Sequence, residues 1–367
     1  MNAERALILG NLLHRPLRSL ITVVAVGVEV CLVVIIVGLT TGLRYETAKR
    51  VEGVGADLLL QPPKSSFVMA ITSAPMPIKI GEKLAEVPHV AAVAPVLVVF
   101  NTSGFEIIYG IELESFRQVS SGFVYHQGGP FEDVGDILVD DRYARGKGVQ
   151  VGDTLNLVEN DFYVRGIVEH GKGARLFAPI ERLQELSAAR DKASLFYIRT
   201  DNPKNVAGVE DAIRQDFPRH KLRRMKEYLS MMVNSPLPML NTFVDSMIAL
   251  AVAVGFLAIF LSMYTSILER TREIGILKSL GASKTDIIRL VLWESLLLCV
   301  VGVGLGIGFC YGGRYLLMEF FPTLTILITV DWLAKAALLG FVGGTLGALY
   351  PAWLAARQDA IVALAYE

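Results

Sequence analysis

The stretch ERTREIGILKSLGASKTDIIR, from Glu269 to Arg289, is a charged island between two strongly apolar segments. These segments, Met247 to Leu268 and Leu290 to Tyr311, are each long enough to cross a bilayer as a helix. The island must therefore lie at a membrane surface. Basic residues recur along it, whereas the segment after the second apolar run carries little positive charge beyond Arg314, so the island is expected in the cytoplasm.

The island has the local signals of a helix, a tight turn and a second helix. Apolar residues follow Thr271 at helical spacing, and Gly281 can take the left-handed conformation that ends a helix. Ser283, with Asp286 three residues on, resembles a capping box. A solvated loop seldom has such apolar spacing, so the pattern predicts a docking surface for a cytoplasmic partner. Its assigned residues are Ile274, Leu277 and Leu280, expected to insert into the partner, with Arg272, Glu273, Lys278, Gly281 and Ser283 around them.

The composition of the whole chain is that of a membrane protein. Its 367 residues are 53% hydrophobic and 19% charged, with a mean hydropathy of +0.47, which is too apolar for an ordinary soluble protein. A net charge of −1 gives no basic surplus for binding nucleic acid. Cys31, Cys299 and Cys310 stand in separate apolar runs, so we expect small core residues rather than disulfides or metal ligands.

The hydropathy pattern predicts an integral membrane α-helical protein with four transmembrane helices and a large α+β extracytoplasmic domain between the first two. Because Arg15 and Arg18 precede the first span, both termini are expected in the cytoplasm. In chain order, the predicted parts are a cytoplasmic amphipathic helix (1–18), the first span (19–43), the extracytoplasmic domain (44–240), the second span (243–268), the island (269–289), the third span (290–311), an outer loop (312–331), the fourth span (332–354) and a cytoplasmic tail (355–367).

The predicted extracytoplasmic domain has ordinary polarity and regular turn signals. Strands are predicted at Asp57–Leu60, Val90–Val99, Glu106–Ile111, Asp136–Val139, Thr154–Val158, Phe162–Val168 and Leu195–Arg199. Helices are predicted at Ile80–Glu86, Ile180–Ser187 and Pro203–Asp216. The last part, Lys221 to Leu240, is basic, then Met-rich, then broken by proline, which favours a stalk leading back to the bilayer.

Glu29 is an ionisable residue at membrane depth in the first span. A charge there costs roughly 2.5 to 3.5 kcal/mol even on the mildest scale, so it usually faces protein or water. The carboxyl group either lines a substrate cavity, is protonated, or pairs with a polar neighbour. Glycines in the last two spans allow close helix packing, within one subunit or at a dimer seam. They are Gly302, Gly306, Gly308, Gly312, Gly340, Gly343, Gly344 and Gly347.

The sequence has no motif of an enzyme. It lacks G-x-x-x-x-G-K-[ST], so ATP is expected to be handled elsewhere. The five histidines are scattered, and no Ser or Cys lies in a nucleophile-elbow pattern. We therefore predict no catalytic, cofactor-binding or metal-binding residue in this chain.

The run TREIGILKSLGASKTDI, residues 271–287, resembles the signature of the FtsX/MacB-like (type VII) permeases of ABC transporters. NLLHRPLRSLITVVAVGV (11–28) resembles the start of that family, ILVDDRYARGKGVQVGDTLNL (137–157) its extracytoplasmic domain, and YPAWLAARQDAIVALAYE (350–367) its C-terminal signature. The resemblance covers the whole chain. The tail departs from it, because the family usually has proline where Ala360 stands and a basic residue where Ala365 stands.

The resemblance implies a permease of the bacterial inner membrane that forms a homodimer or pairs with a similar permease. It implies two copies of a separate ATPase subunit, which binds ATP and Mg, and a mechanism of mechanotransmission in which ATPase motion passes through the membrane to the outer domains. A membrane fusion protein or another extracytoplasmic partner is a further option.

Two function classes stay open at this stage. One is export or extraction of an amphiphilic substrate, such as a lipid, a lipoprotein, a haem-like molecule, a peptide or a drug. The other is a signalling permease that moves nothing and regulates an extracytoplasmic partner such as a cell-wall hydrolase. Apolar residues at the expected outer rim favour the first class. These are Phe67, Met69, Phe320 and Phe321, of which Phe320 and Phe321 are assigned with Glu29 to a substrate cavity.

Overall fold

The computed structural model describes residues 16–63, 65, 75–102, 104, 106–234 and 238–358. The predicted N-terminal amphipathic helix before Pro16, the side chains of Phe67 and Met69, and the tail after Gln358 lie outside the described residues. The chain divides into two units. The membrane unit comprises Met1–Gly42, Pro236–Glu319 and Ile326–Glu367, and the α+β unit comprises Leu43–Ser235 and Phe320–Thr325.

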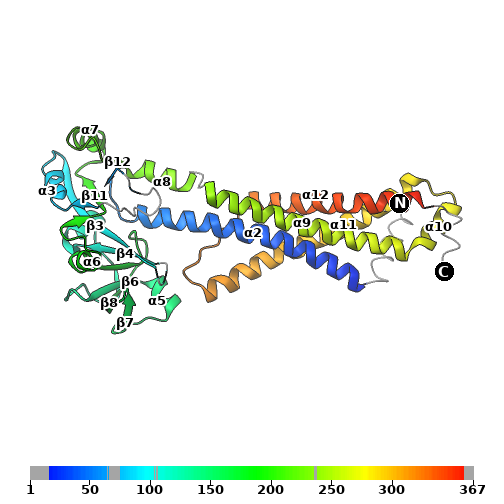
Figure 1. The fold of residues 1–367 in the computed structure, drawn as a ribbon, viewed down its shortest axis with the longest axis horizontal. Coiled ribbons are helices and arrows are strands. Elements are labelled where there is room, and N and C mark those ends of the chain that lie inside the picture. The colour runs from blue at the N-terminus through cyan, green and yellow to red at the C-terminus, as the bar shows by residue number, and fades with distance from the viewer. Residues whose placement is uncertain are drawn as a thin grey trace. The chain divides into compact units, whose positions relative to one another are not determined.

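Four long helices supply the membrane unit, and each is long and apolar enough to span a bilayer. They are α2 (Pro16–Glu52), α9 (Pro238–Glu269), α11 (Lys284–Phe320) and α12 (Val330–Arg357). Within this unit they lie side by side and share one core of aliphatic and small side chains (Figure 1). The predicted fold class, four membrane helices with an inserted α+β domain, is confirmed.

Glycines bring these helices into close contact. A methyl group on Gly302 of α11 would lie 2.7 Å from Val26 of α2, and one on Gly347 of α12 would lie 2.8 Å from the Phe256 carbonyl oxygen of α9. Gly306 and Gly344 meet neighbouring helices in the same way. These glycines therefore pack helices within one subunit. Gly308 and Gly312 have no such neighbour within 4 Å among the described residues.

The helices are longer than the predicted spans. Helix α2 continues past Leu43 to Glu52, and α11 continues past Tyr311 to Phe320. The predicted outer loop, 312–331, is therefore wrong at its start, and the non-helical connection is limited to residues 321–329. Hydropathy identifies only the apolar part of a helix. The helical hydrogen-bonding pattern of the backbone can continue beyond it into polar residues.

The α+β unit is built on a mixed sheet with the strand order β12-β1-β11-β3-β4-β9-β6-β8-β5, and β7 pairs with β8. The pairs β4–β9 and β6–β8 are parallel, and the other pairs are antiparallel. The strands are β1 (Leu58–Gln61), β3 (Val90–Asn101), β4 (Glu106–Ile111), β5 (Tyr125–Gly128), β6 (Asp136–Asp140), β7 (Thr154–Leu157), β8 (Asn160–Val168), β9 (Leu176–Pro179), β11 (Leu195–Thr200) and β12 (Lys221–Arg224), with a separate pair of β2 (Met76–Pro77) and β10 (Lys192–Ala193).

Short helices connect the strands and complete separate apolar cores of this unit. Asp140, at the end of β6, begins one of them by accepting a hydrogen bond from the Tyr143 N–H at 2.6 Å. The helices are α3 (Ile80–Ala85), α4 (Leu113–Ser120), α5 (Asp141–Lys147), α6 (Ile180–Leu186), α7 (Val206–Asp216), preceded by the 3-10 turn η1 (Pro203–Asn205), and α8 (Met225–Asn234).

All of the predicted strands and helices of this unit are present, but the predicted stalk is partly wrong. Lys221–Arg224 is the edge strand β12, in which Leu222 pairs with Leu60 of β1. Leu222 is the one buried residue of this strand, so its sequence lacks the alternation of a half-buried strand. The basic residues beside it belong to a sheet edge, where charged side chains are common.

Candidate functional site

The island folds as its capping signals predict. Helix α10 (Thr271–Ser279) follows α9, and the chain then turns at Gly281, which has a φ of +102°. The Ser283 N–H donates to Asp286 Oδ2 at 2.9 Å, and the Asp286 N–H donates to Ser283 Oγ at 3.3 Å. This reciprocal pair starts α11 and confirms the predicted capping box.

The apolar residues of α10, together with Leu280 at its C-cap, divide between the inside and the outside of the subunit. Ile274 is 6% exposed in the membrane-unit core, and Leu277 packs against that core. Leu280 is 80% exposed and Ile276 is 44% exposed. The prediction that Ile274 inserts into a partner is therefore wrong. Helical spacing identifies an apolar face, but here much of that face packs on the helices of its own bundle.

Lys278 connects the island to the end of α12 through hydrogen bonds. Its Nζ donates to the carbonyl oxygens of Ala356 and Gln358, at 2.7 and 2.6 Å. It thereby satisfies carbonyl groups that the last turn of a helix leaves without partners. The predicted role of Lys278 as an orienting charge at the rim is corrected to this internal contact. The other assigned residues, Arg272, Glu273, Gly281 and Ser283, are exposed.

A buried ion pair that was not predicted from the sequence lies beside the island. Arg270, between α9 and α10, donates to Glu294 Oε2 of α11 through Nη1 and Nη2, at 3.1 and 2.9 Å. The two side chains are 11% and 4% exposed. They line a cavity of about 280 Å³ together with Ile274 and Leu277. Glu294 interrupts an apolar run as Glu29 does, and this sequence signal could have identified it.

The α+β unit contains a second ionic cluster around the buried carboxylate of Glu46, which we call the Glu46 junction. Arg175 Nη2 donates to Glu46 Oε1 at 2.5 Å, and Arg142 Nη1 lies 3.6 Å from the same oxygen. The Thr325 hydroxyl donates to Glu46 Oε2 at 2.6 Å. Arg175 also donates to the Thr323 carbonyl oxygen at 2.9 Å. One carboxylate of α2 therefore binds the sheet domain and the connection between α11 and α12.

Charged groups beside the Glu46 junction are strongly desolvated. Burial raises the pKa of Asp140, although Arg175, the Tyr143 N–H and Arg50 partly offset this effect. Burial lowers the pKa of Arg50, and the charge of Arg175 acts in the same direction. Sequence reasoning missed the junction because its members come from distant segments that only the sheet topology brings together. Its one sequence signal is Glu46 itself, a carboxylate just beyond an apolar run.

Glu29 is enclosed within the membrane unit. It is 3% exposed, and a methyl group on Gly255 of α9 would overlap its carboxyl group. Neither carboxyl oxygen has a hydrogen-bond partner among the described residues. Of the predicted alternatives, pairing with a polar neighbour is therefore not seen in the described part of the chain. Phe320 and Phe321, 73% and 54% exposed, belong to the other unit.

These features define a class of protein: a polytopic membrane protein with an inserted α+β domain and a capped helical element between its second and third spans. Residues 19–216 match the family model of the MacB-like periplasmic core domain, and residues 246–360 match that of the FtsX-like permease C-terminal domain. The chain belongs to the FtsX/MacB-like permeases of ABC transporters. It is accordingly a multi-pass protein of the inner membrane.

Similar proteins include full-length transporters. The macrolide export ATP-binding/permease protein MacB of Hahella chejuensis is 25% identical over 96% of this chain and 58% of that protein. The ABC transporter permease YknZ of Bacillus subtilis is 36% identical over 35% of this chain and 32% of that protein. The chain thus spans little more than half the length of its MacB relatives. The crystal structure of the periplasmic region of MacB from Actinobacillus actinomycetemcomitans aligns with 51% of this chain and 97% of that one, at 14% identity and a TM-score of 0.40.

Proposed function

We propose that this chain is a permease that couples the motion of a cytoplasmic ATPase to its extracytoplasmic α+β domain and so drives export of an amphiphilic substrate. The Glu46 junction is the observation that carries the proposal. Helix α2 runs without a break from the first span to Glu46, where Arg175 and Thr325 share its carboxylate. Breaking one partner from a buried ion pair costs about 3–5 kcal/mol, so a shift of the helix is expected to move the domain with it.

The island supports contact with an ATPase. Its exposed apolar residues, Ile276 and Leu280, project next to the charged Arg272 and Glu273. The concentration of basic residues in the island favours a cytoplasmic location, which also puts both termini in the cytoplasm. The sequence contains no phosphate-binding loop of the G-x-x-x-x-G-K-[ST] type, so two copies of a partner ATPase would bind ATP and Mg.

The substrate side of the proposal is supported by the exposed Phe320 and Phe321, at the connection between α11 and α12. Adjacent exposed aromatic side chains are typical of a surface that receives an apolar molecule. The MacB relatives are named for macrolide export, and a macrolide is amphiphilic. A second permease copy would complete the transporter, and the outward glycines Gly308 and Gly312 are candidates for that seam.

Reconstitution with the cognate ATPase in liposomes tests this function. We expect a macrolide or a fluorescent lipid to stimulate ATP hydrolysis and to be moved across or out of the bilayer in an ATP-dependent manner. Vesicles with a Walker-motif-inactivated ATPase are the control. Stimulation by a soluble extracytoplasmic protein, without movement of any amphiphile, would overturn export and support the signalling alternative.

A further inference from the structure

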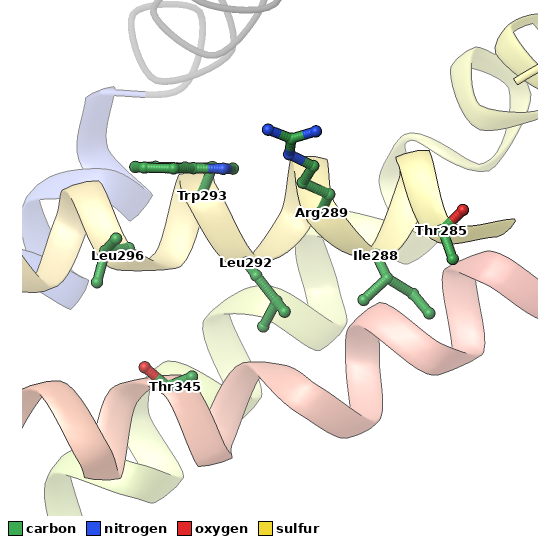
Figure 2. Close-up of a pocket in the computed structure, with 7 residues that line it drawn as sticks. All are labelled: Thr285, Ile288, Arg289, Leu292, Trp293, Leu296 and Thr345. Carbon is green, nitrogen blue, oxygen red and sulfur yellow. The ribbon is translucent and has the colours of Figure 1, made fainter. Parts of the chain in front are cut away.

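A groove runs along α11 on the surface of the membrane unit, beside α12 (Figure 2). Its volume is about 320 Å³. Ile288 and Leu292 point toward α12, while Arg289 and Trp293 stand along the other edge of α11 (Figure 2). The full lining is Thr285, Ile288, Arg289, Leu292, Trp293, Leu296 and Thr345.

The floor of the groove suits a hydrocarbon chain. Ile288, Leu292 and Leu296 follow one another at helical spacing and present only methyl and methylene groups. The hydroxyl group of Thr345 donates to the Phe341 carbonyl oxygen of its own helix at 2.7 Å. The groove therefore offers little to the backbone of a peptide, which would need polar partners in this apolar setting.

Arg289 supplies a positive charge at the rim. It lies at the border between the polar island and the apolar run that begins at Leu290, where lipid headgroups meet the hydrocarbon. Within the described residues Arg289 makes no ion pair within 4 Å, although its charge, after the hydrogen bonds from Ser283, helps to lower the pKa of Asp286. By contrast, Arg270 pairs with Glu294. No described residue takes up the hydrogen-bond donors of the Arg289 guanidinium, so they can bind a phosphate group.

Trp293 places the groove at the membrane interface. It is 50% exposed, one helical turn beyond Arg289. Tryptophan is enriched where headgroups meet hydrocarbon, and basic pockets between membrane helices bind anionic lipid headgroups. An apolar floor, an exposed arginine and an interfacial tryptophan together fit a lipid better than a soluble anion, which would need no apolar floor.

We infer that this groove binds one anionic phospholipid, with its phosphate on Arg289 and an acyl chain along Ile288, Leu292 and Leu296. Assignment to the cytoplasmic leaflet rests on the proposed orientation of the island, but binding itself does not. The groove also includes the end of the island, where the Thr285 hydroxyl lies 2.7 Å from that of Ser283 in the capping box. A bound lipid therefore steadies the start of α11 beside the proposed ATPase contact.

The full-length chain, purified in neutral detergent, can be titrated with phosphatidylglycerol and phosphatidylcholine and followed by native mass spectrometry and thermal unfolding. We expect phosphatidylglycerol to bind more tightly and to raise the Tm further. Arg289→Ala should weaken phosphatidylglycerol binding about tenfold, the effect of one charge-assisted hydrogen bond. Arg289→Lys should retain part of the preference, since the charge is kept.

Arg357→Ala is the matched control. Arg357 is an exposed arginine at the same end of the bundle, but it stacks on Trp353 at 4.2 Å and does not line the groove. The inference is overturned if both lipids bind the wild type equally, if Arg357→Ala removes the preference as fully as Arg289→Ala, or if inorganic phosphate alone reproduces the Tm shift. Because the assay contains no ATPase, its outcome is independent of whether the chain transports a substrate.

Discussion

The buried carboxylate of Glu46 pairs with Arg175 at 2.5 Å although 129 positions separate the two residues in the sequence. Glu46 lies on the helix that begins as the first span, and Arg175 immediately precedes strand β9. Thr325, from the connection between the last two spans, shares the Glu46 carboxylate. The pair therefore joins the α+β domain to two points of the chain that lead directly into membrane helices.

Replacement of Glu46 is expected to uncouple the domain from the helices. Glu46→Ala leaves Arg175 and Arg142 without their shared carboxylate, which should lower the free energy of unfolding of this region by about 3–5 kcal/mol. Glu46→Gln keeps the shape but removes the charge, so its effect should be smaller. In the reconstituted complex, both variants should bind the ATPase normally and lose transport, measured by co-purification and by substrate movement.

Glu52→Gln is the control for this prediction, because Glu52 ends the same helix and is exposed. It should leave coupling and unfolding unchanged. Wild-type transport by Glu46→Ala would show that the junction is not the point of coupling, even if the chain proved to be a transporter.

The exposed apolar residues of α10 and its C-cap are expected to decide association with the ATPase. Leu280→Asp and Ile276→Asp place a charge on the exposed apolar side of the helix and should abolish co-purification of the ATPase. Both variants should elute as folded permease in size-exclusion chromatography. Ile274→Asp should behave differently, because a buried charge in the core destabilises the permease itself. Undiminished co-purification with Leu280→Asp would refute the assigned contact surface.

Local sequence signals predicted the parts of this fold whose causes are local. Apolar runs predicted the spans, and Ser283 with Asp286 predicted the start of α11. Short strand-like runs bounded by turn signals predicted the strands that bury one or both faces. The edge strand β12 was not predicted, because it buries only one leucine and its sequence therefore shows no hydrophobic period of two residues.

Contacts between residues that are far apart in the chain could not be predicted from the sequence alone. Ile274 has the spacing of an exposed docking face, and only the packing of the bundle shows that it points inward. Lys278 carries no sign that it binds the carbonyl groups of Ala356 and Gln358. No local pattern distinguishes Arg175 from the other arginines of the chain. It lies beside Glu46 only in the folded domain. These residues owe their roles to tertiary structure, which single-sequence patterns do not encode.

Asp140 and Asp141 are expected to give opposite dependences of stability on pH. Burial raises the pKa of Asp140, so the folded chain keeps a proton that the unfolded chain releases near about pH 4. Stability therefore falls as pH rises through that window and stays lower above it. Asp140→Asn, which still accepts the Tyr143 N–H, should remove this fall and stabilise α5 at neutral pH.

Asp141 provides the matched comparison. Although burial opposes its ionisation, hydrogen bonds from His170 hold the pKa of Asp141 below its usual range. Its stabilising effect is present above the unfolded pKa and is lost as pH falls through the folded pKa. Asp141→Asn should therefore destabilise α5 at neutral pH and have little effect in acid. Hydrogen exchange of peptides from β6 and α5 measures both variants, and equal changes in both would contradict the assignment.

The effects of substitutions at Glu29 and at Gly255 on stability are expected to depend on each other. A methyl group on Gly255 would overlap the Glu29 carboxyl group, so Gly255→Ala should destabilise the membrane unit by about 1–3 kcal/mol through overpacking. In the Gly255→Ala background, Glu29→Ala should cost less than it does alone, because it makes room for the added methyl. A double-mutant cycle on thermal unfolding in detergent measures this coupling.

The variant Glu29→Gln tests whether the Glu29 carboxyl group is uncharged in the folded protein. Glu29→Gln replaces it with a neutral group of nearly equal shape, and an ionised carboxylate without a partner is costly at membrane depth. The Gln variant should therefore unfold at the same temperature as the wild type or higher. Gly304→Ala, which meets no neighbour within 4 Å among the described residues, controls for the helix propensity of alanine. A strongly destabilised Glu29→Gln, with Gly255→Ala tolerated, would mean that the charge is needed and that the carboxylate meets a cation rather than the glycine of α9.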